Sequence, residues 1–553
     1  MHRLIQVGQQ YSLSDANALA GGLIVSRAHG LQTGDAVRFS ESWGTLEAGD
    51  YYVIRVNPNR IRLATTYQAA LSGTAISTPV GIGASFERIS SIDTHAVQVT
   101  AANRGNIISI GAAAAIVSNS KTADTAAQDP AENVGGAGGN GAGVESVADD
   151  VSNNSTGRKS GIAIAGIASW NQIDDVTVAQ INDGVHVRTS DIAVAQVAAN
   201  NTTSIYGLAG ALSIAKADDT AIGIAGAFSR NLVRQDTRAA LSDADWSGLS
   251  TLDVTATHAG TIGGLTIGVA GSKTTAAAGN QKKKGVAIGG SVSWNTVETR
   301  TLATLETSQL EVNGPVKIAS QDSSRMIVIG GGAGVALNGQ LGFGAGVAVN
   351  VINSETGSSI DRTDIQSQLL DVTAISNPTI VAVAVAAGVG QIGVAGMLAI
   401  NTVNPSANAT VNQSIVDVVD GITVSATEYA EIYSDGGGVA VGIKKAKAGD
   451  DSGAVAAAFG IGVAINEIGA QDGSGVFANL TRSTILGRPN VTVTAQSNAF
   501  IQSLALAGSV AVASQSGEQK GSTAIAGAGA ATRNVISTEI VALSQNTHYD
   551  DAQ

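Results

Sequence analysis

Residues 161–171 read GIAIAGIASWN, and residues 285–295 repeat them almost letter for letter as GVAIGGSVSWN. The asparagine that ends both stretches recurs along the chain on a period of roughly 50 to 70 residues, a spacing that marks a protein built from stacked modules. We therefore read the chain as a repeat array with one asparagine per module. The series consists of Asn171, Asn231, Asn295, Asn350, Asn401, Asn466 and Asn534.

Each copy alternates large and small residues with a period of two. In the first copy Ile162, Ile164 and Trp170 are separated by Gly, Ala or Ser. This alternation is the signature of an extended strand, whereas a Gly-rich helix would lose about 1 kcal/mol per Gly relative to Ala. We predict a strand with one bulky and one thin face that ends at the Asn. Three more strands complete the module: Thr-x-Ala-x-aliphatic, aliphatic-x-Val-x-Ala, and a second Gly/Ala-rich run.

The composition limits the classes of function. The 553 residues include 68 Gly, 3% aromatic and 14% charged residues, so close backbone approach and thin sheets are expected. The net charge of −13 argues against a nucleic-acid partner, whose phosphates would be repelled. The absence of cysteine excludes disulfides, thiolate metal sites and a cysteine nucleophile.

One segment is apolar enough to imitate a membrane span. Residues 380–400 contain a single strongly polar side chain, Gln391, and are long enough to cross a bilayer. Their register with the other copies instead predicts two buried strands joined near Gly390 and Gln391, and we expect no membrane insertion. The first residues lack the apolar core of a signal peptide, and the chain starts and stops in mid-pattern. We therefore expect it to be a segment of a longer protein.

The first ninety residues do not show the repeat pattern of the rest of the chain. Residues 51–56 (YYVIRV) and 60–64 (RIRLA) flank an Asn-Pro-Asn turn, which is a hairpin signal. We predict an all-β protein in which residues 1–90 form a small antiparallel barrel or sandwich. Residues 91–553 are predicted to form an elongated β-solenoid-like rod of about seven modules, with residues 121–160 as a long flexible loop.

The recurring asparagine has two structural explanations. At a turn, Asn tolerates a left-handed backbone and can hydrogen-bond the matching Asn of the next coil, forming a ladder. The alternative is a local Asx-turn without any ladder. Both assign the seven residues to geometry and not to chemistry, so we predict no catalytic, cofactor-binding or metal-binding residues.

The acidic residues and histidines do not form a pattern typical of a catalytic or metal-binding site. Polysaccharide-cleaving β-helices need an acid and a base at a set separation, but the acidic residues here concentrate in loop tips. Paired aspartates leave a bound Ca²⁺ as a minor alternative to turn and solubility roles, because no calcium-binding repeat accompanies them. Six single histidines are expected on the surface or at strand edges: His2, His29, His95, His186, His258 and His548.

Two aligned rows of side chains are further candidates. Trp170 and Trp294 share one repeat position, where a sugar-stacking stripe is conceivable but packing or an inter-module seam is favoured. The threonines of the second strand also align, which leaves ice binding as a remote alternative; they are Thr177, Thr237, Thr301 and Thr356.

The motifs together resemble those of a known group. Residues 29–35 (HGLQTGD), 49–64 (GDYYVIRVNPNRIRLA) and 70–77 (ALSGTAIS) resemble the small β module interspersed in giant bacterial surface proteins. The GxAxxGxxSxN, TxAxI and VxVxA patterns are similar to repeats of large filamentous adhesins, of the filamentous-haemagglutinin-like and leukotoxin-type filamentous groups.

This resemblance implies a structural and adhesive segment of a secreted or surface-anchored bacterial fibre. Such a fibre would act outside the cell, in cell–cell or cell–surface contact, with a receptor or glycan as its partner. Two alternatives stay open: a filament subunit that associates head to tail, and a β-helix that binds or cleaves carbohydrate.

Overall fold

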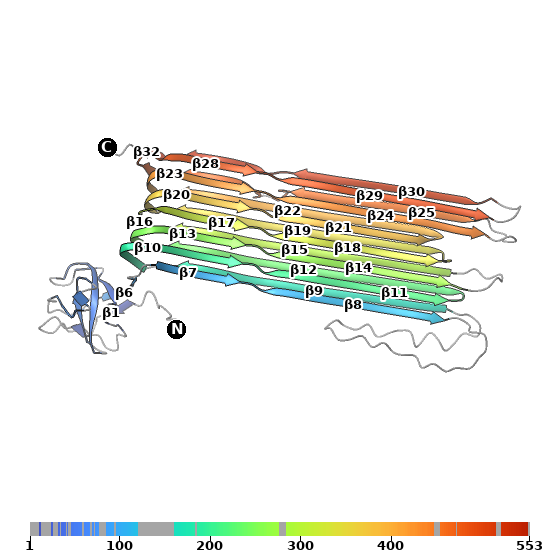
Figure 1. Cartoon of the computed structure of the whole chain (residues 1–553), viewed down its shortest axis with the longest axis horizontal. Helices are drawn as coiled ribbons and strands as arrows, with labels where there is room; N and C mark the ends of the chain where they lie inside the picture. The colour runs from blue at the N-terminus through green and yellow to red at the C-terminus, as the bar shows by residue number, and fades with distance from the viewer. Residues whose placement is uncertain are drawn as a thin grey trace.

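The computed structural model describes residues 10–12, 24–25, most of 31–76, 85–92, 96–119, 160–182, 185–275, 284–446, 454–471, 473–515 and 521–550. These residues form an all-β structure of long, stacked parallel strands, with a small antiparallel sheet near the N-terminus (Figure 1). The predicted fold class, an elongated solenoid-like array, is confirmed.

One coil illustrates the architecture. β13 (Asp245–His258) and β14 (Thr261–Thr274) follow each other in one layer, and β15 (Lys284–Glu306) returns as the opposite layer. All pairing between successive coils is parallel, with Asn231 directly opposite Asn295, for example. The two layers of a coil pack face to face, so the turn between them does not create an antiparallel ladder.

Seven coils stack in this way, and equivalent strands form three sheets. The proximal sheet contains β7 (Ala96–Asn103), β10 (Val185–Asn201), β13, β17 (Pro315–Asp322), β20 (Asp364–Ser376), β23 (Ile415–Glu428) and β28 (Asn490–Ser497). The distal sheet contains β8 (Asn106–Asn119), β11 (Ser204–Ala217), β14, β18 (Arg325–Leu337), β21 (Thr379–Gly390), β24 (Glu431–Ala446) and β29 (Phe500–Gln515). The return sheet contains β9 (Ser160–Ile181), β12 (Thr220–Ser242), β15, β19 (Leu341–Asp361), β22 (Ile392–Asn412), β25 (Val455–Ile468) and β30 (Thr523–Ile536).

Short strands close the proximal end of the coils and extend the return sheet. They are β16 (Gln309–Val312), β26 (Gly475–Thr481), β27 (Thr484–Leu486), β31 (Glu539–Gln545) and β32 (His548–Asp550). The return strands β12 and β15 have 23 residues each. At about 3.3 Å per residue they are roughly 75 Å long, whereas seven coils about 4.8 Å apart stack over roughly 34 Å. The long axis of the molecule therefore lies along the strands, and its shape is a slab and not a rod (Figure 1).

The N-terminal part is an antiparallel sheet built on its own small core. Its strands are β1 (Gln10–Ser12), β2 (Ile24–Val25), β3 (Ala36–Phe39), β4 (Gly49–Asn57), β5 (Arg60–Ala64) and β6 (Ser85–Ile92). The predicted hairpin is the β4–β5 pair. β6 pairs antiparallel with β3 and also parallel with β10, so it belongs to both parts of the chain. The predicted loop at 121–160 lies outside the described residues, apart from Ser160, which begins β9.

The predicted strand break at the asparagine is wrong. Asn171 lies in the middle of β9, a continuous strand of 22 residues, because the alternation continues past it without a turn-forming Gly or Pro. Left-handed backbone occurs instead twelve residues later, at the end of the return strand. The residues there are Asp243 (φ 49°), Thr307 (48°), Arg362 (49°), Gln413 (50°), Asn546 (55°) and, because four residues are inserted between Asn466 and Leu480, Arg482 (50°).

The distal half of each coil is thin because Gly, Ala and Ser face inward. A Cβ added to Gly289 or Gly344 would overlap the carbonyl oxygen of Ala333 or Ala387 in the opposite layer, so the two backbones are in contact. The bulky residues face outward: Ile164 is 57% exposed. The predicted thin face is therefore the inner one.

The proximal half is thicker and has an ordinary aliphatic core. Trp246, 1% exposed, packs there with Leu, Ile and Val from the proximal and return sheets. The apolar stretch 380–400 forms β21 and the start of β22, joined at Gln391 as predicted. Among the described residues, none lies in a helix long and apolar enough to span a bilayer.

We expect Gly289→Ala to lower the free energy of unfolding by at least about 1–3 kcal/mol, because its methyl group overpacks the backbone of the opposite layer. The adjacent Gly290 is the matched control, since a Cβ there meets its nearest neighbour, the Ala345 oxygen, at 3.8 Å. Chemical unfolding of both variants measures the difference. Equal losses in the two variants would contradict the close contact of the layers.

Candidate functional site

The seven repeat asparagines form one column through the interior of the slab. Each side-chain amide donates from Nδ2 to Oδ1 of the Asn in the next coil, at 2.7–2.9 Å, from Asn171 through Asn534. Asn231, Asn295, Asn350, Asn401 and Asn466 are completely buried. Of the two explanations offered by the sequence, the structure contains the ladder and not the Asx-turn.

The second N–H of several of these amides also has a partner. Asn171, Asn231 and Asn295 each donate to the hydroxyl of the serine two residues earlier, at 3.0–3.3 Å. In the fifth coil, Asn401 donates instead to Ser434 across the layers, at 3.0 Å. Full pairing of a buried amide offsets its desolvation, and for this reason the column can lie between apolar residues.

A second polar column was missed in the sequence. It lies on the inner side of the corner between the proximal and distal sheets, two residues after the Val-x-Ala pattern. Unlike the asparagines, its members differ from coil to coil, so no repeated letter identifies it. They are Asn103, Asn201, His258, Asp322, Ser376, Glu428 and Ser497, which pair in register.

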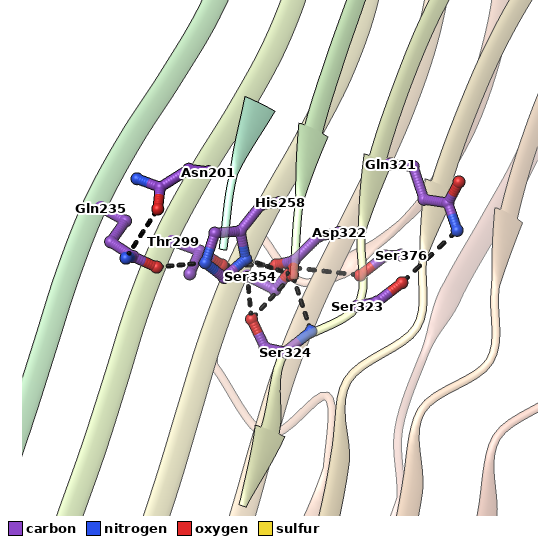
Figure 2. A network of polar contacts seen from close by, with 10 residues as sticks. All are labelled: Asn201, Gln235, His258, Thr299, Gln321, Asp322, Ser323, Ser324, Ser354 and Ser376. Carbon is purple, nitrogen blue, oxygen red and sulfur yellow. Dashed lines mark hydrogen bonds and ion pairs between the residues drawn. The ribbon is translucent and has the colours of Figure 1, made fainter. Parts of the chain in front are cut away.

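His258 and Asp322 form an ion pair within this column, and both side chains are fully buried. The imidazole Nδ1 lies 2.9 Å from Asp322 Oδ1, and Nε2 faces Gln235 Oε1. The Gln235 amide is oriented by its own nitrogen, which donates to Asn201 Oδ1 at 3.1 Å. Both ring nitrogens therefore lie against side-chain oxygens, one from a carboxylate and one from an amide (Figure 2).

The Asp322 carboxylate accepts further hydrogen bonds from donors in two neighbouring coils. Thr299 and Ser354 donate to Oδ2 from the return sheet, and the Ser324 backbone and hydroxyl donate to Oδ1 at 2.9 and 2.7 Å. Burial by itself raises the pKa of Asp322. The charge and hydrogen bond of His258, together with the hydroxyls of Ser354 and Thr299, outweigh burial and lower that pKa from 3.8 to about 2.

Glu428 occupies the same column two coils later, and its pKa is shifted in the opposite direction. Its carboxylate accepts from the Ala430 backbone N–H at 2.8 Å and from the Ser497 hydroxyl. No cation is among the groups that shift it, so burial dominates and raises the pKa of Glu428 above 4.5. The column therefore contains one carboxyl held as an anion and one shifted toward the neutral acid.

A third column of hydroxyls lies at the end of the return strands. Each Ser or Thr that follows the left-handed residue donates to the carbonyl two residues back, for example Ser308 to Glu306 at 2.7 Å. The hydroxyl also accepts from the equivalent backbone N–H of the preceding coil, as Ser308 does from Ala244 at 3.1 Å. Thr363, Ser414 and Ser483 repeat the arrangement.

The outer face of the return sheet carries a groove of about 760 Å³ that crosses six coils. We call it the outer groove. It lies directly behind Thr299 and Ser354, whose hydroxyls bind Asp322 on the inner side. Its lining comprises Asp174, Asp175, Val176, Arg234, Gln235, Asp236, Glu298, Thr299, Arg300, Asn353, Ser354, Glu355, Asn404, Ser406, Gln471, Gly473 and Ser474.

The two ends of the outer groove differ in charge. At one end, Arg234 binds Glu298 at 2.8 Å and lies 3.7 Å from Asp174, and Arg300 binds Glu355 at 3.3 Å. The hydrogen bond and charge of Glu298 raise the pKa of Arg234. The other end is neutral: it presents amides and hydroxyls.

That neutral end depends on the four-residue insertion that the sixth coil carries between Asn466 and Leu480. Asn404 donates to Asn353 Oδ1 at 2.8 Å and accepts from the Gln471 backbone at 3.2 Å. The residue after Asn404 is Pro405, which cannot donate to a neighbouring strand. The pairing of β22 with the next coil is interrupted there, between Val403 and Ser406, and the insertion occupies the gap as the groove wall.

The aligned tryptophans lie on the outer face of the return sheet, and the aligned threonines lie in its interior. Trp170 and Trp294 are 64% and 49% exposed, so they are not packed in the core, and the guanidinium of Arg230 lies 4.6 Å from the Trp170 ring. The threonines are buried, which is incompatible with an ice-binding surface; Thr177 is 5% exposed, and Thr237, Thr301 and Thr356 are 0% exposed.

The prediction that the histidines lie on the surface or at strand edges is wrong for His258. This side chain is buried because Asp322 and Gln235 provide hydrogen-bond partners for its ring nitrogens. His548, in the last strand, is exposed as expected. Among the described residues, no group of three or more His, Asp or Glu side chains could hold a metal ion.

Comparison with protein families, curated proteins and solved structures finds no match for this chain. The resemblance to filamentous adhesins therefore stays a prediction.

We expect Asn350→Ala to lower the free energy of unfolding by about 1–3 kcal/mol, because Asn295 Nδ2 loses its acceptor and Asn401 Oδ1 its donor in a buried setting. Asn408→Ala is the matched control: Asn408 is on the outer face and exposed. The Asn408→Ala substitution should change the free energy of unfolding by no more than about 0.5 kcal/mol. Urea unfolding of both variants measures this, and an equally small loss for Asn350→Ala would contradict a stabilising ladder.

Asp322→Asn should lower the free energy of unfolding by about 3–5 kcal/mol at neutral pH, because it breaks a fully buried ion pair. The folded pKa of about 2 is below the ordinary 3.8. The carboxylate's contribution, about 2 kcal/mol of that loss, is thus complete above about pH 4 and disappears as the pH falls toward about 2.

Unfolding titrations of wild type and variant across this pH range measure that difference. A gap between the two proteins that is constant down to about pH 2 would contradict the assigned pKa.

Proposed function

We propose that this chain is a structural and adhesive segment of a large secreted or surface-anchored bacterial fibre. It would act outside the cell, in contacts between cells or between a cell and a surface, with a receptor or glycan as its partner. The observation that carries the proposal is the parallel stacking of seven coils. The resemblance of the sequence to filamentous adhesin repeats supports the same function.

The physical properties of the stack suit a segment of a fibre. Backbone hydrogen bonds run along the stacking axis from coil to coil, and the Asn ladder runs parallel to them through six intervals. Pulling along this axis would load many hydrogen bonds at the same time. The broad outer faces vary from coil to coil, which allows binding specificity without a change in the scaffold.

Self-assembly into a filament is the alternative that one observation favours. β8 and β29 end the distal sheet, and each pairs with only one strand among the described residues. Unpaired strand edges can template association with another chain. A head-to-tail stack of copies would lengthen the structure along its short axis.

A bead assay tests the adhesive proposal. Latex beads coated with the purified chain should be retained under flow on bacterial and animal cell layers several-fold more than albumin-coated beads. Retention equal to albumin on every layer would contradict it.

Sedimentation and negative-stain microscopy at increasing concentration separate the alternatives. We expect a slab of roughly 75 Å by 34 Å whose size is independent of concentration. Filaments that lengthen with concentration would favour self-assembly.

A further inference from the structure

The dimensions of the outer groove suit a linear polymer. It crosses six coils, so with coils about 4.8 Å apart it is roughly 24 Å long. The coil spacing is close to the length that one pyranose unit adds to an extended polysaccharide. A sugar chain lying across the strands would therefore meet a new row of side chains with each residue, and the match continues over the whole groove.

The chemistry of the lining suits hydrogen bonding to sugar hydroxyls. The side chains are planar and polar: carboxylates, guanidinium groups and amides, which can each bond two neighbouring hydroxyls. Their positions are fixed by ion pairs and by the Asn404–Asn353 bond, so little side-chain freedom is lost on binding. They also remain accessible, since the Asp174, Arg234 and Glu355 side chains are 51%, 51% and 57% exposed.

The charge pattern selects against an anionic ligand. Arg234 and Arg300 are already paired with Glu298 and Glu355, so neither is free to bind a sulfate or carboxylate group. The end formed by Asn353, Asn404 and Ser406 is uncharged. The net charge of the protein, −13, would also repel a polyanion.

We propose that the outer groove binds a linear, uncharged polysaccharide laid across the coils, about five sugar units at a time. This inference deepens the adhesive function proposed above and rests on it. The Asn353 and Asn404 amides bond the sugar hydroxyls at the neutral end. The ion-paired carboxylates and guanidiniums do so at the other.

Affinity electrophoresis is the first test. The full chain is run in native gels that contain a soluble glucan, mannan, galactan or xylan, one polymer per gel, and in a gel with heparin. We expect at least one neutral polymer to retard the chain and heparin to have no effect. The absence of retardation in all four neutral gels, or retardation by heparin alone, overturns the proposal.

Oligosaccharides of the retarding polymer then test the length of the site by calorimetry. The affinity should rise with each unit up to about five and then reach a plateau, because longer chains extend beyond the groove. A disaccharide that binds as tightly as a hexasaccharide would show a small pocket and not this groove.

Two substitutions locate the site. Asn404→Ala removes an amide of the lining, and Ser406→Phe fills the groove from an outward-facing position. Each should weaken binding about fivefold to tenfold or more. Asn408→Ala is the control, because it changes the same residue type on the same outer face of β22 but outside the lining.

The unfolding midpoint shows whether each variant is folded, and Asn404→Ala carries the test if Ser406→Phe is not. Equal weakening by Asn408→Ala, or none by Asn404→Ala, overturns the assignment.

The bead assay keeps the two proposals distinguishable. If wild-type beads adhere while groove variants bind glycan normally, only the groove assignment fails. If the chain binds glycan but the beads do not adhere, only the adhesive function fails.

Discussion

In-register parallel stacking is the constraint on which the rest of this structure depends. Each side chain lies about 4.8 Å from its equivalents in the coils on either side, so every inner position becomes a column. A polar residue can be buried only if its column provides partners. The asparagines meet this condition with identical neighbours, because one amide both donates and accepts.

The corner column meets the same condition with unlike neighbours. His258 pairs with Asp322, and the hydroxyl of Ser354 connects Asp322 to Ser376 in the next coil. Removing one partner from such a pair is costly, although an apolar column would also have been stable. Thr299 and Ser354 bind this cluster from the return sheet and also line the outer groove, so they connect the interior of the slab to the groove.

Much of the fold can be predicted from the sequence because residues that recur in every module occupy equivalent positions in the coils. The asparagine series, the period-two alternation and the Val-x-Ala strands define the coils and the column of Asn171 to Asn534. The continuity of the return strands was not predictable, because an Asn in mid-strand is tolerated only once the neighbouring coil supplies its partner. The outward direction of Ile164 follows from the contact between Gly-lined layers, which depends on the opposite strand.

The His258–Asp322 pair and the outer groove were hidden for a different reason. Their residues are separated by one or more modules and differ in type from coil to coil. His258 and Asp322 are 64 residues apart, and nothing near either one indicates the other. Only the register, which brings position 258 opposite 322, shows that two apparently unrelated residues are neighbours.

The amides of the Asn ladder all point the same way. Every Nδ2–H is directed toward the following coil, so the row of side-chain dipoles adds up along the stack and does not cancel. The first coil presents the carbonyl oxygen of Asn171, and the last presents the N–H groups of Asn534. Hydrogen-bonded amides polarise one another, so each link strengthens the next. The Asn ladder is therefore polarised along the stack, and its two ends carry opposite partial charge.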